Sequence, residues 1–544
     1  MKTNVITIAD TSAFPVDGWV WLASSADFAS SGLAVGEAGY FPPTKISQVA
    51  RIKSKTANTL ILYDDVLYDF KVSDNAVVAL INTKSTYRLD NIRIIGAGQH
   101  YQTGISFNRC VDVELNDIRT DQVDHAGIRL DRCIHVTINR PSSFDAHEVG
   151  TSYGVSVANG CHLVTINDPY GEDLRHTVTI GGRPGINHYI TVNDVTAIGM
   201  RDAGVDSHPA GNFITFNGGY IQCAASSTGP KDGVMMQGQN GDISGIKVVG
   251  CFSYAVAVES YAAAGVSHSA SVRDILIEHS GRPNGSAYYG VAIYTSTSGE
   301  LNTVEVSGIR CSANSGKMSS AVYIAPRNGA IKDVLIHGNP KLKGEYAGVY
   351  VDARNGSLVD GITISNNALE SVTNATITLM GKAGENNIKN IVINGNRSKT
   401  DAAYHVQFND CENGSEFGNM YLGTPTRPVN VTSGSKSISV DRSKYPVRTV
   451  TLPAATINVE DEKVVFARQT ASTTVTLPVA ADWSNRELTF KRVYNFSVDS
   501  TLANVVPLNS VVAGTSILPA VSGSWVTLKS NGVNWVAISG STPT

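Results

Sequence analysis

Two acid–base groups stand close together in the stretch GVDSHPAGNFITFNGG, which begins at Gly204. Asp206 and His208 are separated by one residue, so both side chains would face the same side of a strand. Histidine titrates near neutral pH, and a neighbouring carboxylate can orient its ring and fix its tautomer. The pair therefore predicts a group that transfers protons.

A second pair, Arg175-His176, precedes the first by one repeat, in the segment YGEDLRHTVTIGG. We predict that Arg175, His176, Asp206 and His208 are the catalytic residues. Eight of the twelve histidines lie between positions 100 and 208, which favours this part of the chain as the site. The residues expected to bind the substrate around them are Tyr153, Tyr170, Glu172, Asp173, Arg201, Asp202, His147 and Lys231.

A repeated phrase indicates how these residues are positioned. GISFNRCVDVELND, GIRLDRCIHVTINR and GVSVANGCHLVTIND begin at Gly104, Gly127 and Gly154, which lie 23 and 27 residues apart. Looser copies continue to about residue 420. Each copy is a short strand, a turn and another short strand, and no helical periodicity lies between the copies. Such periods are typical of solenoids, and the pattern predicts a right-handed parallel β-helix rather than a twisted sandwich.

Stacking of the copies assigns the faces of each strand. Val205 takes the inward position, so Asp206 and His208 should face outward. The predicted equivalents of Asp206 in neighbouring rungs are Arg129, Ser156, Thr179 and Met235. Cysteines 110, 133 and 161 should form an internal stack. The asparagines at strand ends are expected at turns, in left-handed backbone, and they are Asn116, Asn139, Asn167, Asn193 and Asn217.

Composition excludes several classes of protein. The net charge is −4 and no basic region stands out, which argues against binding to nucleic acid or to an anionic membrane. No apolar run is long enough to span a bilayer. The first residues lack the apolar stretch of a signal peptide, so we expect synthesis in a cytoplasm. The seven cysteines include no CxxC pair, which predicts reduced, buried thiols rather than disulfides or zinc ligands.

The sequence divides into three predicted domains. Residues 1–76 show no single secondary-structure pattern. They are expected to be a cap of the solenoid or the remnant of a virion-attachment domain. Residues 77–422 form the β-helix, which carries the catalytic residues. Residues 423–544 read as an all-β, antiparallel domain, in which an Asn-Gly turn separates two strands of GSWVTLKSNGVNWVAISG. This domain is expected to serve trimerisation or carbohydrate binding.

The Arg-His pair, followed one rung later by Asp-x-His and a strand that ends in Asn, resembles the pectate-lyase-like β-helix proteins of bacteria and phages. That resemblance implies acidic polysaccharide substrates. The C-terminal segment resembles the terminal domains of phage tail fibres and tailspikes, although a sugar-binding sandwich on a bacterial enzyme is the alternative. The tailspike resemblance implies a homotrimer on the virion tail or baseplate that acts on capsule, O-antigen or exopolysaccharide. No calcium-binding aspartate cluster is evident, so no metal or cofactor is expected.

Two chemistries fit these residues. Elimination needs a cation, a base and an acid, which Arg175 or Arg201, a histidine, and a tyrosine or second histidine would supply. Hydrolysis needs two carboxyl groups, and Glu172, Asp173, Asp202 and Asp206 are available. The abundance of Arg and His favours elimination slightly. The residues are also compatible with a uronate epimerase or with a non-catalytic receptor-binding fibre, and the fibre would use tyrosines 101, 153, 220, 254, 261, 288 and 289 as stacking platforms.

Overall fold

The computed structural model describes most of the chain, and the fold is nearly all β. The described residues are 3–29, 44–81, 86–97, 102–146, 150–181, 185–224, 232–251, 253–278, 288–312, 318–402, 404–422, 428–432, 434–441, 448–457, 461, 463–467, 471–483 and 486–543. They form two compact units, Met1–Tyr350 and Val351–Thr544, which are described separately. No helix in the described part of the chain is long and apolar enough to cross a membrane.

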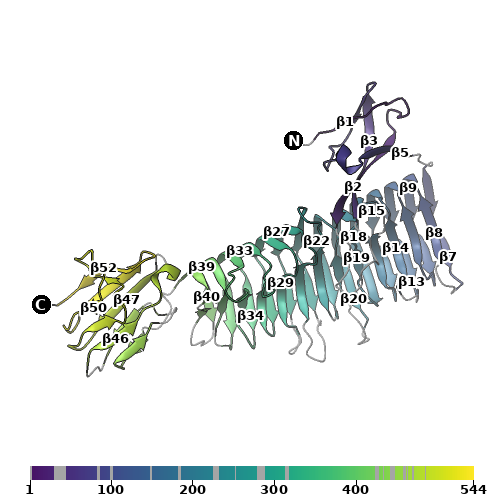
Figure 1. Ribbon diagram of the computed structural model, residues 1–544. Helices are drawn as coiled ribbons and strands as arrows, with labels where there is room; N and C mark the ends of the chain where they lie inside the picture. The colour runs from purple at the N-terminus through teal and green to yellow at the C-terminus, as the bar shows by residue number, and fades with distance from the viewer. Residues whose placement is uncertain are drawn as a thin grey trace. The chain divides into compact units, whose positions relative to one another are not determined.

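The first unit is built around a parallel β-helix, whose successive rungs lie side by side in Figure 1. Its first sheet contains β8 (Thr103–Asn108), β11 (Ala126–Asp131), β14 (Tyr153–Ala158), β17 (His176–Gly181), β19 (Val205–Ser207), β21 (Val234–Met236), β23 (Tyr254–Ser260), β26 (Tyr289–Thr295) and β29 (Ser320–Pro326). These strands pair in parallel, each with the strand of the next rung. The predicted parallel β-helix is therefore confirmed.

The second sheet of this unit contributes up to two strands per rung. Its strands are β6 (Tyr87–Asp90), β7 (Arg93–Ile95), β9 (Val111–Asn116), β10 (Arg119–Asp121), β12 (Ile134–Asn139), β13 (Ser142–Phe144), β15 (His162–Asn167), β16 (Tyr170–Glu172), β18 (Asn187–Met200), β20 (Gly211–Cys223), β22 (Gly241–Val249), β24 (Ser267–Arg273), β25 (Leu276–Glu278), β27 (Glu300–Ser307), β28 (Arg310–Ser312), β30 (Ala330–His337) and β31 (Lys341–Gly344). Its pairs are also parallel, so the same positions stack in both sheets.

Inward positions form apolar columns, which make up the core. In the first sheet Val155, Val178, Val205 and Val234 stack in register, and each is at most 1% exposed. Steric crowding explains why the repeated phrase begins with glycine. A Cβ on Gly127 would lie 2.3 Å from Thr120 Oγ1 and 2.9 Å from the carbonyl oxygen of Gly154, so a larger residue would push the rungs apart.

The asparagine column is a ladder of side-chain amides. The Nδ2 atom of each asparagine donates to Oδ1 of the one before it, at 2.8 Å from Asn139 to Asn116, 2.8 Å from Asn167 to Asn139 and 2.9 Å from Asn193 to Asn167. Asn116, Asn139 and Asn167 end their strands and Asn193 lies within β18, all in extended backbone, so the expected left-handed conformation is wrong for them. The residue after each one is left-handed instead, and those residues are Asp117, Arg140, Asp168 and Asp194.

The cysteines follow the same stacking rule. Cys110, Cys133 and Cys161 are buried thiols on successive rungs, as predicted, and the backbone N–H of Cys133 donates to Sγ of Cys161 at 3.3 Å. The expectation that all seven cysteines are reduced is wrong for Cys223 and Cys251, which form a disulfide. Their Cα atoms are 5.2 Å apart because the two residues lie on neighbouring rungs.

The N-terminal segment adds an antiparallel sheet to the first unit. Its elements are β1 (Val5–Thr7), β2 (Trp19–Ala29), β3 (Thr44–Lys55), β4 (Thr59–Leu62), the 3₁₀ turn η1 (Val72–Asp74) and β5 (Val77–Ile81). This sheet contacts the second sheet of the solenoid through buried polar groups. His188 Nε2 donates to the carbonyl oxygen of Ser47 at 2.9 Å, and Asn212 Nδ2 donates to the hydroxyl oxygen of Tyr68. The N-terminal segment is thus anchored on the wall of the solenoid.

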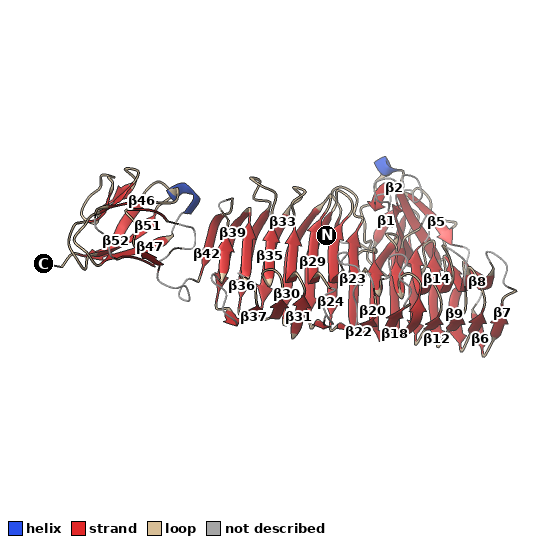
Figure 2. Cartoon of the chain, turned by 90° about the horizontal axis from the view of Figure 1, so that it is seen from below, coloured by secondary structure: helices blue, strands red, loops and turns tan. Residues whose placement is uncertain are grey.

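The second unit continues the strand–turn–strand pattern and ends in a β-rich module. Its solenoid strands are β33 (Val359–Ser365), β34 (Ala368–Ser371), β35 (Ile377–Met380), β36 (Ile388–Asn394), β37 (Arg397–Thr400), β38 (Val406–Asn409), β39 (Cys411–Phe417), β40 (Met420–Leu422), β41 (Val429–Val431) and β42 (Lys436–Val440), while β32 (Ala347–Asp352) spans the boundary of the units. The C-terminal module contains β43 (Arg448–Val450), β44 (Ala454–Thr456), β45 (Lys463–Phe466), β46 (Thr473–Thr476), the 3₁₀ turn η3 (Ala480–Trp483), β47 (Glu487–Arg492), β48 (Val498–Ser500), β49 (Val505–Val506), β50 (Ser516–Leu518), β51 (Trp525–Ser530) and β52 (Trp535–Ser541). Figure 2 shows how strands dominate both units. The predicted Asn-Gly hairpin is present between β51 and β52, while β43, β45 and β47 pair in parallel.

Buried histidines make the first unit sensitive to acid. Burial lowers the pKa of His188 to about 4 and that of His162 to about 3, so both rings are neutral in the folded chain. The unfolded chain takes up these protons near pH 6.5, before the folded chain does. We therefore expect the free energy of unfolding to fall as pH drops from 6.5 to 4, by about 3 kcal/mol for His188 alone.

Thermal unfolding between pH 7.5 and 4.5 measures this effect. His188→Gln should flatten the pH dependence, because the replacement cannot be protonated. The control is His337→Gln, since His337 is 37% exposed beside Glu305 and should leave the slope unchanged. An unchanged slope in His188→Gln would contradict the assignment.

Candidate functional site

The candidate site lies on the outer face of the first sheet, around Asp206. Asp206 pairs in register with Thr179 of β17 and Met235 of β21, and Thr179 pairs with Ser156. The predicted register and the outward orientation of Asp206 are therefore confirmed. Asp206 is nevertheless only 4% exposed, because neighbouring side chains cover it.

His208 and Asp206 form the central pair of the site. His208 Nε2 lies 3.0 Å from Asp206 Oδ2, and the His208 side chain is 26% exposed. The room for the imidazole comes from Gly181, since a Cβ at that position would lie 2.5 Å from His208 Cδ2. With Nε2 donating to the carboxylate, the basic nitrogen of the neutral ring is Nδ1.

His176 is held behind this pair rather than presented to solvent. Its Nδ1 donates to the carbonyl oxygen of Ala203 at 2.8 Å, and its ring stacks on Tyr153 with centroids 5.6 Å apart. Nε2 lies 3.8 Å from a carboxylate oxygen of both Asp202 and Asp206. Burial lowers the pKa of His176 in spite of these carboxylates. The ring is 2% exposed, and the catalytic role predicted for His176 stays a prediction.

Arg175 brings a cation to the edge of the site. Its Nε donates to Asp202 Oδ2 at 3.0 Å, and its Nη1 lies 3.3 Å from the hydroxyl of Tyr153. The side chains of Arg175 and Asp202 are 30% and 31% exposed. Together with His208 they are among the groups of the site that reach solvent.

Asp232 is a carboxyl group that holds its proton. Burial, together with the charges of Asp202, Asp206 and Glu259, raises its pKa to about 8. Its Oδ1 accepts a hydrogen bond from the backbone N–H of Tyr254 at 3.0 Å. At neutral pH Asp232 is therefore an acid placed among carboxylates.

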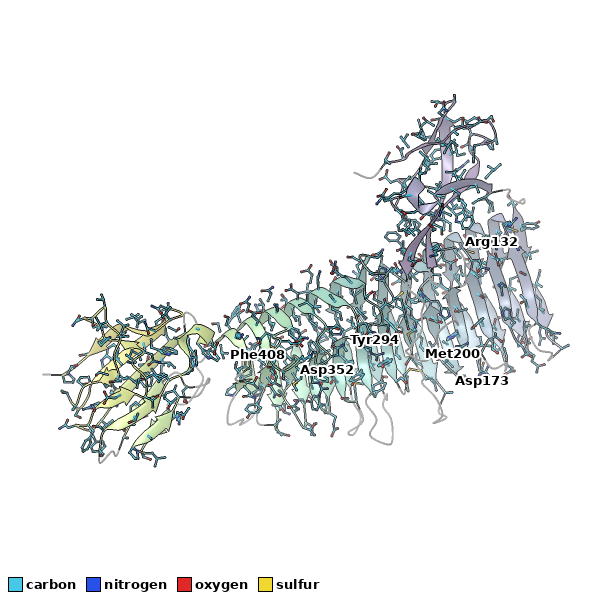
Figure 3. The ribbon with its side chains drawn as sticks, in the orientation of Figure 1. Arg132, Asp173, Met200, Tyr294, Asp352 and Phe408 are labelled. Atoms are coloured by element: carbon cyan, nitrogen blue, oxygen red, sulfur yellow. A yellow bond between two sulfur atoms is a disulfide. The ribbon has the colours of Figure 1, made fainter. Side chains whose placement is uncertain are left out.

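Sequence reasoning missed Glu259 and Arg327. Glu259, on β23, follows His208 and Gln237 in one outward column and accepts hydrogen bonds from Gln237 Nε2 at 2.8 Å and from Ser296 Oγ. Arg327 lies 4.1 Å from the ring centroid of Tyr294, a residue labelled in Figure 3. Unequal turn lengths before β21 and β23 hide the alignment of Glu259 with His208, and strand register is the signal that could have found it.

The remaining predicted residues are distributed around the cluster. Arg201 donates from Nη2 to the carbonyl oxygen of Ala146 and interacts electrostatically with Asp173. Tyr170 and Glu172 lie on β16 of the second sheet, where the tyrosine hydroxyl donates to the carboxylate at 2.8 Å. The structure thus brings Arg175, His176, Asp202, Asp206 and His208 together with Tyr153, and places Tyr170 and Glu172 elsewhere. His147, Lys231 and Tyr101 lie outside the described residues.

The other tyrosines expected to act as platforms are mostly occupied by protein contacts. Tyr261 is 5% exposed and Tyr288 fully buried. Tyr254, Tyr289 and Tyr323 stack on one another along the first sheet, with ring centroids 6.1 Å and then 3.9 Å apart. Their ring faces are therefore turned towards neighbouring rungs. Within the described ranges no group of three or more His, Cys, Asp or Glu side chains could hold a metal ion.

The fold and this cluster define the chain as a parallel β-helix protein with acid–base groups on its outer wall. No protein-family model matches it. The sequence is 23% identical over 249 residues to a K1-specific capsule depolymerase of Klebsiella phage K64-1. That match covers 43% of this chain and 26% of the relative, so it spans about a quarter of the relative's length.

Two solved tailspike structures are similar to this one. The tailspike gp61 of Pseudomonas phage phi297 is 14% identical with a TM-score of 0.48, over 69% of this chain and 60% of the other. The tailspike Gp54 of Acinetobacter baumannii bacteriophage AP22, solved with a capsular saccharide, is 13% identical with a TM-score of 0.43, over 90% of this chain and 66% of the other.

The raised pKa of Asp232 gives a stability signature. Because the folded chain retains this proton up to about pH 8 and the unfolded chain loses it near 3.8, the folded state weakens as pH rises between these values. Asp232→Asn keeps an acceptor for Tyr254 N–H without the ionisation. We expect the variant to gain stability over the native chain by up to about 1.4 kcal/mol per pH unit in this window.

Chemical unfolding at pH 5, 7 and 8.5 checks this expectation. Asp242→Asn is the control, since Asp242 lies at the surface in an ion pair with Arg273. A constant difference between Asp232→Asn and the native chain across these pH values would contradict a protonated Asp232.

Proposed function

We propose that this chain depolymerises a bacterial surface polysaccharide, either capsule, O-antigen or exopolysaccharide, at the cluster around Asp206. The observation that carries the proposal is the partly exposed His208, which lies 3.0 Å from Asp206, in a cluster where the buried Asp232 retains its proton. The capsule depolymerase of Klebsiella phage K64-1, which matches part of the chain, supports the same substrate class. A fibre that only binds sugar would not need this arrangement.

Elimination is the chemistry that we propose first. His208 Nδ1 takes the proton from the carbon beside the carboxylate of a uronic acid, while Arg175 offsets the charge that develops. The bond from the adjacent carbon to the glycosidic oxygen breaks, a carbon–carbon double bond forms, and an acid of the cluster protonates the leaving oxygen. Arg175 and His208 suit these roles because both reach solvent.

Hydrolysis is the second candidate, and the buried carboxyl groups favour it. Asp206, Asp232 and Glu259 stand on the rungs of β19, β21 and β23, and one of them is protonated at neutral pH. In this chemistry the acid protonates the same leaving oxygen, and a carboxylate activates a water or attacks the sugar directly. The two candidates differ in what the base acts on, so their products differ.

The context proposed for the chain is the phage virion. We propose a homotrimer on the tail or baseplate, made in the host cytoplasm and acting outside the cell. Light scattering of the purified chain tests the trimer, and a monomeric mass would overturn that part. The other parts of the proposal do not depend on it.

The reaction is tested on a panel of purified capsular and O-polysaccharides by two readouts, the ultraviolet absorbance of an unsaturated product and the release of reducing ends. Elimination raises both signals, and hydrolysis raises only the reducing ends. Binding without either signal would overturn the enzymatic proposal and leave a receptor-binding fibre.

Replacement of the base should abolish most of the activity. We expect His208→Ala to lower kcat/KM by about 10²- to 10⁴-fold, since a positioned general base contributes that much. His337→Ala is the matched control, because His337 is also a surface histidine beside a carboxylate, at 3.2 Å from Glu305. Equal activity of the two variants would exclude His208 as the base.

Replacement of Glu259 separates the two chemistries. Glu259→Gln should lower the rate at least as strongly as His208→Ala if the bond is hydrolysed between carboxyl groups. In elimination we expect a loss of about tenfold or less, because Glu259 then acts only through its charge. Asp242→Asn again controls for loss of a surface carboxylate.

A further inference from the structure

One position of the second sheet is left-handed in rung after rung. The residues at this bulge, with φ between 51° and 57°, are Asp112, His135, Leu163, Tyr189, Phe213 and Asn240. The register shows that they are equivalent, because the residues on either side pair with one another, as Ile134 pairs with His162 and Val136 with Val164. Later rungs of this unit have Thr303 and Asp333 at the bulge. In the second unit the bulge residues are Gly361, Asn390, Asn413 and Ser437.

Four consecutive rungs break the chemical pattern of this column. Elsewhere the bulge is taken by Asp, Asn, Gly, Ser or Thr, most of which tolerate left-handed backbone well. His135, Leu163, Tyr189 and Phe213, here called the bulge column, are bulky. A left-handed conformation costs a residue with a large side chain about 1–2 kcal/mol, and such costs concentrate at functional sites. Core packing does not explain the choice, since these side chains point outward.

The bulge column is an exposed apolar surface with a fixed geometry. Leu163 and Tyr189 are 37% and 38% exposed. The rings of Tyr189 and Phe213 are nearly parallel, with centroids 5.0 Å apart. At the other end, Trp19 from the N-terminal sheet packs edge-on against His135, with centroids 5.6 Å apart. These contacts hold the side chains in place before any ligand arrives.

A groove of about 660 Å³ runs beside the bulge column. Its lining includes His135, Leu163 and Tyr189 on one side and three threonines, Thr137, Thr165 and Thr191, that stack on consecutive rungs. The hydroxyl groups repeat at strand spacing, about 4.8 Å, which is close to the length of one sugar residue. An apolar wall beside a row of hydroxyl groups matches the two kinds of surface that a sugar presents.

The cation at this groove is already paired. Arg88 Nε lies 3.0 Å from Asp90 Oδ2, and Arg88 Nη1 lies 3.6 Å from Glu114 Oε2. Among the described residues of the lining, Arg88 is the one lysine or arginine, and Asp112 and Glu114 are its carboxylates. The lining therefore offers no unpaired cation to an acidic sugar, which favours an uncharged ligand.

We propose that this groove is a second, non-catalytic glycan-binding site that holds an uncharged stretch of about three sugar residues, one per rung. The ligand class follows from the chemistry of the groove and does not require that the Asp206 cluster cleaves anything. The groove lies on the second sheet, whereas Asp206 lies on the first, so one chain could hold a polysaccharide at one face while the other face acts on it. Four side chains form too small a patch for a stable contact with a second copy.

The test is affinity electrophoresis of the full chain in gels that contain dextran, mannan, galactan or a purified capsular polysaccharide. The native chain should be retarded in at least one gel. The double variant Leu163→Asn with Tyr189→Asn should bind about tenfold more weakly. Its melting temperature should not fall, because asparagine fits left-handed backbone. Thr303→Asn is the matched control at the same bulge, outside the groove, and should bind like the native chain.

Asp206→Asn separates this proposal from the proposed depolymerase function, since that variant should lose cleavage and keep the retardation. Three results would overturn the second site: no retardation of the native chain in any gel, retardation that survives the double variant, or retardation lost in Asp206→Asn alone. A smaller oligomer for the double variant in light scattering would also overturn it, by assigning the bulge column to a contact between copies. If no polysaccharide is cleaved but the native chain is still retarded, the enzymatic proposal is wrong and the proposal of a second binding site is supported.

Discussion

The structure depends on the backbone hydrogen bonds that join each rung to the next. A parallel ladder fixes equivalent residues about 4.8 Å apart, so any residue type that recurs once per rung becomes a continuous column. The valines of the core, the amide ladder from Asn116 to Asn193 and the stacked thiols all arise in this way. Even the Cys223–Cys251 disulfide needs only two cysteines on neighbouring rungs. The candidate functional residues lie where a column changes its residue type.

The Asp206 cluster is such a change, and its electrostatics follow from the same spacing. Carboxyl groups on successive rungs cannot all be ionised in a buried setting without strong repulsion. The repulsion is reduced because His208 contacts Asp206, Arg175 forms an ion pair with Asp202, and Asp232 retains its proton. The fold thus produces acid and base groups side by side from one residue type, because burial and neighbours differ from rung to rung.

The sequence was sufficient to predict the side-chain orientations that the regular repeat determines. It was not sufficient to align residues where the repeat is irregular. The recurring start of the phrase, a glycine followed by a β-branched residue, was enough to place Val205 inward and Asp206 outward. Glu259 was missed because the turns before β21 and β23 differ in length, which hides its alignment with His208. The left-handed residue was assigned to Asn139 instead of Arg140, since residue preference alone does not distinguish a strand's last residue from the one after it. Burial, which makes Asp232 an acid, leaves no local pattern in the sequence.

A solenoid also separates binding from chemistry without a second domain. Its two sheets share one core, so a change on one outer face leaves the opposite column in register. The first sheet carries the titratable groups of the Asp206 cluster, while the second carries ion pairs, hydroxyl groups and the bulky left-handed residues from His135 to Phe213. Conformational cost at four successive rungs is tolerated because the ladder on both sides of the bulge holds the backbone.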